Sequence, residues 1–408
     1  MPTEKSKHLS KKKSRYATTF NKSKNCYHAK ETTMTASQPI ELSIDRNQIL
    51  NALRLMTGIL ETSQVLPILG FIKLTLRQHN ELTLTTTDGE TKMSSQLNTL
   101  ASNIETLDIA VPGKKFTDIC KQLPNDGPIT MAFSAPWVTI RQQDVSFKLQ
   151  TLNTESFPDI NIDEQNITTA SIPERELQKL MQKTVFSMGQ QDIRLYLNGV
   201  HMSINSDKIS ATATDGHRLS FQHSQQENRS QFEFIMPRKV VLELNKQLKQ
   251  QTDELADIGY SNLLTIKTKD FTLTTSTLKG QYPDCTRFQE GIYEHSANIN
   301  VEALKRALQR ASILSHDKFK AVKITLSDNE LIITAYNQEQ ENIHEKIALT
   351  YQGPNTTLGF NINYIMDILS NVASETIDIQ FTEANKNVLF SEPNQKSQSS
   401  YIVMPLVV

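Results

Sequence analysis

The chain has 408 residues, of which 38% are hydrophobic and 21% are charged, with 43 basic and 44 acidic side chains. Such a chain has room for roughly two to four domains, and its composition excludes a disordered polymer and a protein with long apolar membrane spans. The three cysteines lie far apart and no glycine-rich phosphate-binding motif occurs. We therefore expect no disulfide framework, no metal and no nucleotide cofactor, and free thiols suited to a reducing cytoplasm.

The first 38 residues differ from the rest in charge. They hold nine basic residues against Glu4 and Glu31, which leaves 34 basic and 42 acidic residues in the remaining body. The segment has little to bury and lacks the apolar stretch of a secretory signal, so we expect a disordered basic extension. It either adds nonspecific contact to nucleic acid or is dispensable, with Met34 as an alternative start.

An amphipathic helix is predicted at the start of each third of the body. Apolar residues recur there at spacings of three and four, as at Leu177, Leu180 and Met181. These helices are expected at residues 46–56, 174–183 and 301–308. Each is followed by two strands of alternating polarity, at 72–76 with 82–87, 200–204 with 209–214, and 322–326 with 331–335.

A second helix follows in each third, and the starts of these helices are 125 and 124 residues apart. Pro112 and Pro237 are predicted at the first helical position, where a missing N–H costs nothing. The sequence thus predicts an α+β protein with three repeated domains. The predicted division is a basic extension at 1–38 and domains at 39–160, 161–290 and 291–408.

The predicted helices are more basic than the body that contains them. The six helical segments sum to a charge of +9, while the rest of the body carries −17. Basic helices in an acidic protein favour a surface that faces phosphates, although ordinary solvated helix faces give the same pattern.

Five short motifs carry a resemblance to a known family. They are Leu66-Pro-Ile-Leu-Gly70, Asp192-Ile-Arg-Leu-Tyr-Leu-Asn-Gly199, Ala213-Thr-Asp-Gly-His-Arg-Leu219, Tyr282-Pro-Asp284 and Tyr401-Ile-Val-Met-Pro405. In order and spacing they resemble the bacterial DNA polymerase III beta subunit, the sliding clamp. The resemblance covers the body from about residue 40 to residue 408, and only the extension has no counterpart.

The resemblance implies three clamp domains per chain and a head-to-tail homodimer that forms a six-domain ring. Helices would line the hole, with β-sheet outside. Such a ring would hold duplex DNA without reading its bases, and would tether the replicative polymerase alpha subunit, the clamp loader and other proteins with a Gln-x-Leu-x-Phe type motif. The expected place is the bacterial cytoplasm, at the nucleoid.

The resemblance also implies a partner-peptide groove with apolar walls and a rim of Arg and His. The matching positions are Leu197, Thr214, Gly216, His217, Arg218, Leu219, Pro283, Arg287, Ile402, Val403, Met404, Pro405 and Leu406. The chain departs from the family pattern at Cys285 and Thr286, where an aromatic residue and Arg are common, and at Phe288, which replaces a smaller apolar residue. We expect these departures to alter groove specificity.

Candidate DNA contacts lie on the predicted helices and on two loops. They are Lys114, Lys115, Lys121, Lys179, Lys183, Arg238, Lys239, Lys246, Lys305, Arg306 and Arg310, with Gln191, Leu195, Tyr196 and Ser63 on the loops. For each cation, simple solvent exposure explains its presence as well as phosphate contact does. The expected dimer seam uses Phe147 and Leu149 on an edge strand and Ile313 and Leu314 at a helix end, for which an intramolecular core is the alternative.

Asp215 and His217 raise the possibility of acid–base catalysis. No nucleophile, second carboxylate or metal-spaced partner accompanies them, so we expect an accessory subunit and no enzyme. Two alternatives stay open from the sequence: a divergent clamp paralogue in DNA repair or mobile-element replication, and a DNA-processing hydrolase on the same scaffold.

Overall fold

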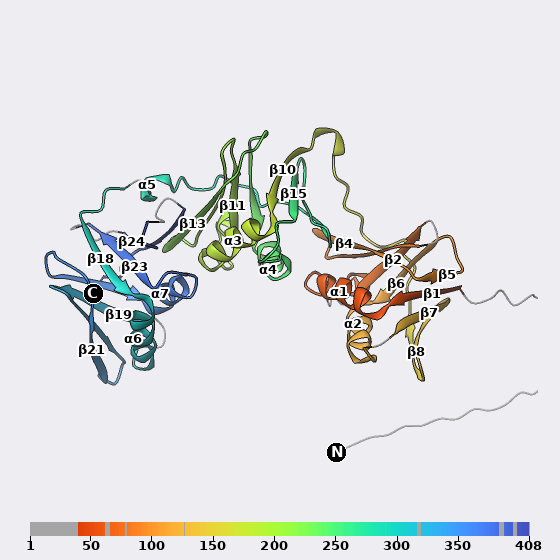
Figure 1. The fold of residues 1–408 in the computed structure, drawn as a ribbon, viewed down its shortest axis with the longest axis horizontal. Helices are drawn as coiled ribbons and strands as arrows, with labels where there is room; N and C mark the ends of the chain where they lie inside the picture. Colours follow the sequence, from red (N-terminus) through yellow and green to blue (C-terminus); the bar gives the residue numbers. More distant parts are fainter. Residues whose placement is uncertain are drawn as a thin grey trace, which may run out of the picture. The chain divides into compact units, whose positions relative to one another are not determined.

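The computed structural model describes residues 40–61, 66–77, 80–125, 127–289, 291–315, 320–382, 387–394 and 398–407. The predicted extension and Ser63 lie outside the described residues. The described chain runs three times through one series of elements: strand, helix, four strands, helix and three strands (Figure 1). The predicted α+β triplication is therefore confirmed.

The three repeats have the following elements. The first contains β1 (Ile40–Asp45), α1 (Arg46–Met56), β2 (Phe71–Arg77), β3 (Glu81–Thr87), β4 (Thr91–Asn98), β6 (Leu107–Pro112), α2 (Gly113–Gln122), β7 (Pro128–Ser134), β8 (Trp137–Gln142) and β9 (Val145–Gln150), with the short β5 (Ala101–Ser102) added. The second contains β10 (Thr168–Pro173), α3 (Glu174–Thr184), β11 (Gly199–Ile204), β12 (Lys208–Thr214), β13 (Arg218–Gln225), β14 (Phe232–Pro237), α4 (Arg238–Gln247), β15 (Leu255–Tyr260), β16 (Leu264–Lys267) and β17 (Thr272–Thr275). After the short helix α5 (Thr286–Gln289), the third contains β18 (His295–Asn300), α6 (Val301–Ile313), β19 (Ala321–Ser327), β20 (Glu330–Tyr336), β21 (Asn342–Ala348), β22 (Thr356–Asn361), α7 (Ile362–Leu369), β23 (Thr376–Phe381), β24 (Val388–Ser391) and β25 (Ser399–Val403).

Helix starts follow from local side-chain chemistry. The side chains of Asp45, Asn300 and Asn361 accept hydrogen bonds from backbone N–H groups in the first turns of α1, α6 and α7. Pro112 and Pro237 stand one residue earlier than predicted, at the cap position just before α2 and α4. That shift costs nothing, since proline has no N–H to lose there.

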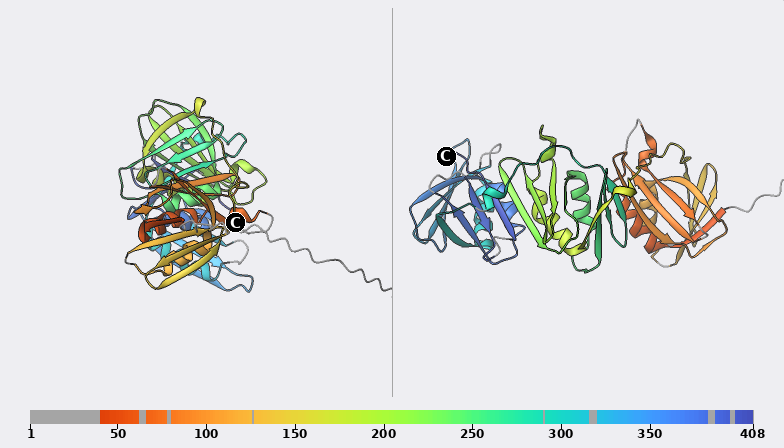
Figure 2. Two further views of the ribbon diagram at one scale, coloured as in Figure 1. Left: turned by 90° about the vertical axis from the view of Figure 1, so that its right-hand side faces the viewer. Right: turned by 90° about the horizontal axis from the view of Figure 1, so that it is seen from above.

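Each repeat builds two four-stranded antiparallel sheets around its two helices. In the second repeat, one sheet has the strand order β10, β15, β16, β17 and the other has the order β14, β11, β12, β13. The two helices of a repeat touch one another, and the first also contacts strands of both sheets (Figures 1 and 2). Alternating strand residues such as Ile72, Leu74 and Leu76 are fully buried against them.

Strand pairing also joins successive repeats. β17, the last strand of the second repeat, pairs antiparallel with β4 of the first, with Thr275 opposite Thr91. β25, the last strand of the third repeat, pairs in the same way with β13 of the second, with Ile402 opposite Leu219. Each junction fuses two four-stranded sheets into one eight-stranded sheet. The equivalent strands β9 and β21 end their sheets without such a neighbour in the described part of the chain.

A buried ion pair supports the junction between the second and third repeats. The Nζ of Lys183 on α3 lies 2.9 Å from Oε1 of Glu392 and also donates a hydrogen bond to the carbonyl oxygen of Asn371. Both side chains are almost fully buried. Burial raises the pKa of Glu392, but the hydrogen bond and charge of Lys183, together with N–H donors from Ala373 and Ser374, hold that pKa below its usual range.

Removing one partner of this pair leaves the other charge buried. We expect Lys183→Ala to lower the free energy of unfolding by about 3–5 kcal/mol, because Glu392 loses its counter-charge. The double variant Lys183→Met with Glu392→Gln should recover much of that loss. Urea denaturation measures the difference, with Lys179→Ala as the control because Lys179 is only half-buried and has no ion-pair partner in the described chain.

Equal losses for Lys183→Ala and Lys179→Ala would contradict this account. The pH dependence has a definite sign, since the folded pKa of Glu392 lies below its unfolded value near 4.5. The pair stabilises the fold above that pH, and its contribution disappears as the pH falls through the folded pKa. Glu392→Gln should therefore lose less stability on acidification than the unchanged chain.

Candidate functional site

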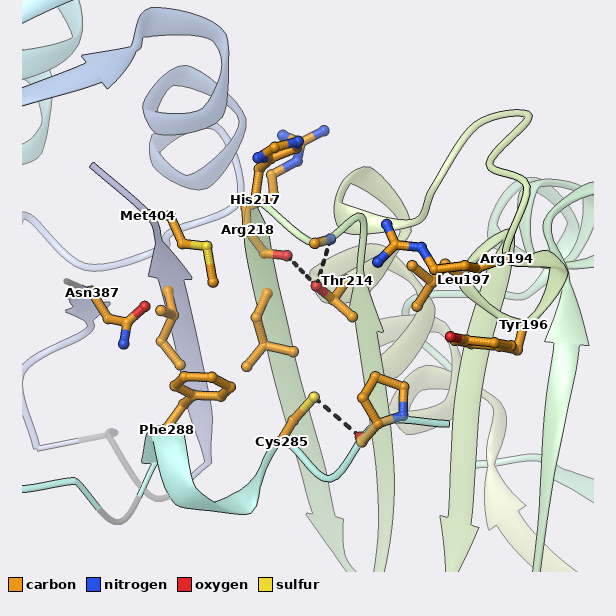
Figure 3. Close-up of a pocket in the computed structure, with 14 residues that line it drawn as sticks. Arg194, Tyr196, Leu197, Thr214, His217, Arg218, Cys285, Phe288, Asn387 and Met404 are labelled. Carbon is orange, nitrogen blue, oxygen red and sulfur yellow. Dashed lines mark hydrogen bonds between the residues drawn. The ribbon is translucent and has the colours of Figure 1, made fainter. Parts of the chain in front are cut away.

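A cavity of about 200 Å³ opens where the second and third repeats meet (Figure 3). It draws its walls from the loop before β11, the β12–β13 turn, the segment before α5, and the ends of β24 and β25. Its lining residues are Arg194, Tyr196, Leu197, Thr214, Gly216, His217, Arg218, Leu219, Pro283, Cys285, Phe288, Asn387, Ile402 and Met404. Residues up to 210 positions apart in sequence thus share one apolar trough with a polar rim.

The pairing of β13 with β25 brings these segments together. Leu219 stands opposite Ile402, and the N–H of Met404 donates to the carbonyl oxygen of His217. Leu219 and Ile402 are buried in a small apolar cluster with Leu389, against which Cys285 and Phe288 pack. The C-terminal strand therefore supplies one wall of the cavity and the second repeat supplies the other.

Most of the residues expected at the groove line this cavity, and four do not. Val403 faces the core of the third repeat, Arg287 places its guanidinium 4.7 Å from the Phe288 ring, and Pro405 and Leu406 follow the strand end. Leu406 instead donates its N–H to the carbonyl oxygen of Gly359. Asn387 and Arg194 line the cavity although nothing in the sequence singled them out for it.

The Thr214–Leu219 turn is held by its own side chains. Asp215 accepts hydrogen bonds from the N–H groups of His217 and Arg218 with one oxygen, and its other oxygen is 3.0 Å from Arg218 Nε. Thr214 donates to the carbonyl oxygen of Arg218, and Gly216 has a φ of +89°, which suits glycine. The Asp215 carboxylate thus holds the turn in place. This structural role explains the presence of Asp215 without an acid–base function.

Arg218 ties the cavity wall to the third repeat. Its Nη1 is 2.5 Å from Asp367 Oδ2 on α7, and its guanidinium carbon lies 4.4 Å from the centre of the Tyr364 ring. The Phe186 ring contacts the guanidinium as well. An arginine paired with a carboxylate and stacked on an aromatic ring keeps a fixed orientation. The rim of the cavity is therefore rigid on this side.

The segment before α5 forms the opposite wall. The N–H of Thr214 donates to the Tyr282 hydroxyl, and the Tyr282 ring stacks on His201 with centroids 5.0 Å apart. Burial raises the pKa of Tyr282 far above its usual value. Burial also raises the pKa of the Cys285 thiol to about 11, so this thiol stays protonated and behaves as an apolar wall group.

The candidate DNA residues fall into three groups. Lys114 and Lys115 are exposed, Lys179 and Lys305 are half-buried, and none of these four has an ion-pair partner among the described residues. Lys121, Lys246, Arg306 and Arg310 have intrachain carboxylate partners: Asp118, Glu243, Glu302 and Glu345. Arg238 donates weakly to the carbonyl oxygen of Met188, at 3.4 Å.

Two of the candidate lysines form ion pairs with carboxylates of a neighbouring repeat, which argues against a role in DNA contact. Lys183 is buried in its ion pair with Glu392, and Lys239 is paired with Asp88 and Glu61 of the first repeat. Both hold repeats together, so their charges are already neutralised within the chain. On the loop, Gln191 and Leu195 are exposed, whereas Tyr196 lines the cavity.

The expected seam residues lie on the edge strand β9 and at the end of helix α6. Phe147 and Leu149 are half-buried on β9 and pack against the core of the first repeat. Ile313 is 78% exposed at the end of α6, beside Leu314. The seam stays a prediction, and the exposed apolar side chain of Ile313 suits a further interface.

Comparison with known proteins decides the family. Sequence models of the N-terminal, central and C-terminal domains of the DNA polymerase III beta subunit match residues 40–162, 171–284 and 293–407. The beta sliding clamp of Vibrio cholerae is 34% identical over 369 residues, which is 90% of this chain and 100% of that protein. That of Escherichia coli is 32% identical over the same length, with the same shares covered.

This chain belongs to the DNA polymerase III beta subunit family. The crystal structure of the beta subunit from Pseudomonas aeruginosa matches with a TM-score of 0.85 at 30% identity, over 90% of this chain and 100% of that one. Beta sliding clamps are non-catalytic processivity factors of DNA polymerase, so the expected function and the expected lack of an enzymatic reaction are confirmed.

Two further findings concern the described residues only. No group of three or more His, Cys, Asp or Glu side chains among them could hold a metal ion. None of their helices is both long and apolar enough to cross a membrane. Residues 1–39 precede the part of the chain that the family matches.

Proposed function

We propose that two copies of this chain close head to tail into a ring around duplex DNA, and that the cavity beside Met404 receives the peptide motifs of the replicative polymerase, the clamp loader and other partners. The repeated junction between strands carries the proposal. The DNA-bound ring would act at the nucleoid in the bacterial cytoplasm. We also propose domain limits at 39–160, 161–290 and 291–408, which the repeated order of elements supports.

Both junctions between repeats follow one strand-pairing pattern, and this pattern leaves two edge strands, β9 and β21, without a neighbour from another repeat in the described chain. In both junctions, the last strand of a repeat pairs with the strand after a Thr-Asp-Gly turn of the preceding repeat. Among the described residues, no earlier repeat pairs with β9 and no later repeat pairs with β21. A second copy supplies both missing neighbours, and the contact is heterologous, as a ring requires.

Equivalent positions also predict the register. At the two junctions, Val403 pairs with Arg218 and Thr275 pairs with Thr91. Leu149 on β9 corresponds to Val403 and Thr275, and Glu341, just before β21, corresponds to Arg218 and Thr91. Phe147 would then stand opposite Ile343 of the second copy, on the face that contacts helices. Val145 would stand opposite Glu345, whose carboxylate is paired with Arg310 within its own chain.

A charge on the inner face of β9 should break the ring. Phe147→Asp places a carboxylate opposite Ile343 and near Glu341 and Glu345, and forfeits the roughly 1.5–3 kcal/mol that burial of Phe contributes at each seam. We expect monomers of 46.2 kDa by light scattering at micromolar concentration. Thr139→Asp, one strand inside the edge on the outer face, should leave the dimer intact, and a monomeric unchanged chain would refute the ring.

Encirclement predicts topological retention on DNA. A chain loaded on nicked circular DNA should stay bound in high salt and slide off once the circle is linearised, whereas a conventional binder should show no difference. Residual binding at low salt should be independent of DNA sequence. Alanine at Lys114, Lys115 and Lys179 should lower the slope of log affinity against log salt by roughly 0.9 for each phosphate that the helices no longer neutralise.

The control for this charge effect uses two exposed lysines on strands, Lys267 and Lys323. Their replacement by alanine should leave the slope unchanged, because strands are proposed to lie outside the ring. An equal change in both sets would place the DNA elsewhere.

Removal of the C-terminal wall should abolish partner binding. Deletion of residues 404–408 removes Met404 and leaves Leu219 and Ile402 exposed, so a Gln-x-Leu-x-Phe type peptide should lose at least about tenfold in affinity. Deletion of residues 407–408 alone is the control, since Val407 does not line the cavity. Fluorescence anisotropy measures the affinity, and unchanged binding after the longer deletion would move the partner site elsewhere.

A further inference from the structure

A second, larger cavity of about 730 Å³ lies on the outer face of the β14–β11–β12–β13 sheet. Its floor consists of the outward side chains of β11 and β12, among them His201, Ser203 and Thr212. Residues 277–286, which we term the strap, run across one end of this sheet on the side away from α3 (Figure 1). A cavity of this size accommodates several residues of an extended peptide.

The strap is fixed at several points, so the cavity is preformed. The Leu278 N–H donates to the carbonyl oxygen of Ile235 at 2.9 Å. Gly280 has a φ of +129° and lies so close to Tyr196 that a Cβ there would be 2.9 Å from its ring. Tyr282 adds its hydrogen bond from Thr214 and its stack on His201.

The strap is also the wall between the two cavities. Pro283 and Cys285 line both the partner-peptide groove and the second cavity. Tyr282 holds this wall to the turn that forms the groove, through Thr214. A peptide that leaves the groove past Pro283 therefore enters the second cavity directly.

The second cavity is polar where the groove is apolar. Lys208, Ser210, Thr212 and Lys279 line it without side-chain partners among the described residues. Glu233 and Asp284 balance the two lysines, and burial lowers the pKa of His201, which leaves it neutral near pH 7. The walls therefore favour neither an anion nor a cation, but they offer the donors and acceptors that an extended main chain with Ser, Thr, Asn or Gln side chains needs.

We propose that the second cavity binds the polar residues that flank a partner's apolar motif, while that motif occupies the groove across the strap. The inference rests on the proposed function of the groove. The outer face of the second repeat would then contribute to partner specificity, because peptides with the same apolar residues would still differ in their polar flanking residues.

Paired peptides test this assignment. One labelled peptide carries only a Gln-x-Leu-x-Phe type motif, and two longer ones add a run of alternating Ser and Asn before or after it. One of the longer peptides should bind the full chain roughly three- to tenfold more tightly than the short one, as one or two net hydrogen bonds would give. Ser203→Trp, which fills the cavity from β11, should remove that gain and leave the affinity of the short peptide unchanged.

Lys267→Trp is the matched control, because Lys267 is an exposed strand residue of the same repeat outside the cavity. It should keep the gain. Hydrogen exchange of the unchanged chain gives a readout that needs no variant: the longer peptide, and not the short one, should protect residues 201–212.

Four results would separate a failure of the flank site from a failure of the groove. Equal affinity for all three peptides, or a gain that survives Ser203→Trp, would overturn the second cavity as a flank site. Failure of the short peptide to bind the unchanged chain would overturn the groove itself and this inference with it. Protection confined to the C-terminal strand would also overturn the flank site.

Discussion

Antiparallel pairing between the last strand of one repeat and the strand after the turn of the preceding repeat is the interaction on which the rest of this structure depends. At β4–β17 and at β13–β25, backbone hydrogen bonds continue a sheet from one repeat into the next. Such bonds need no particular side chains, so three diverged repeats can keep one junction geometry. The same rule leaves β9 and β21 without such a neighbour in the described part of the chain, and the proposed ring rests on these two strands.

Side chains then give each junction its own properties. At the second junction, Lys183 and Glu392 form a buried pair, and Arg218 reaches Asp367 on α7. At the first, Lys239 joins α4 to Asp88 and Glu61. Charges used in this way are not available for phosphates, so the proposed DNA-facing surface would depend on cations such as Lys114 and Lys179 that have no carboxylate partner among the described residues. Net helix charge overstates that surface.

The groove exists only because the second junction exists. Leu219 and Ile402 face each other across β13 and β25, and the Met404 N–H bonds to the His217 carbonyl oxygen. Any change that separates these strands removes the groove, while a change in the strap alters only one wall. Because the strap borders a second, polar cavity, the proposed apolar anchoring and polar selection of partners would depend on different residues.

The sequence by itself determined the triplication, the α+β class, the approximate helix positions and most of the residues that line the cavity, because helical periodicity and short motifs are local or repeated signals. The seam residues Phe147 and Ile313 stay predictions. Only the tertiary structure decided which lysines are free, since Lys183 and Lys239 meet carboxylates that are far away in the chain. For the same reason the sequence did not predict Asn387 and Arg194 at the cavity. Strand pairing brings them there, and a local sequence pattern does not indicate which distant segment a residue will contact.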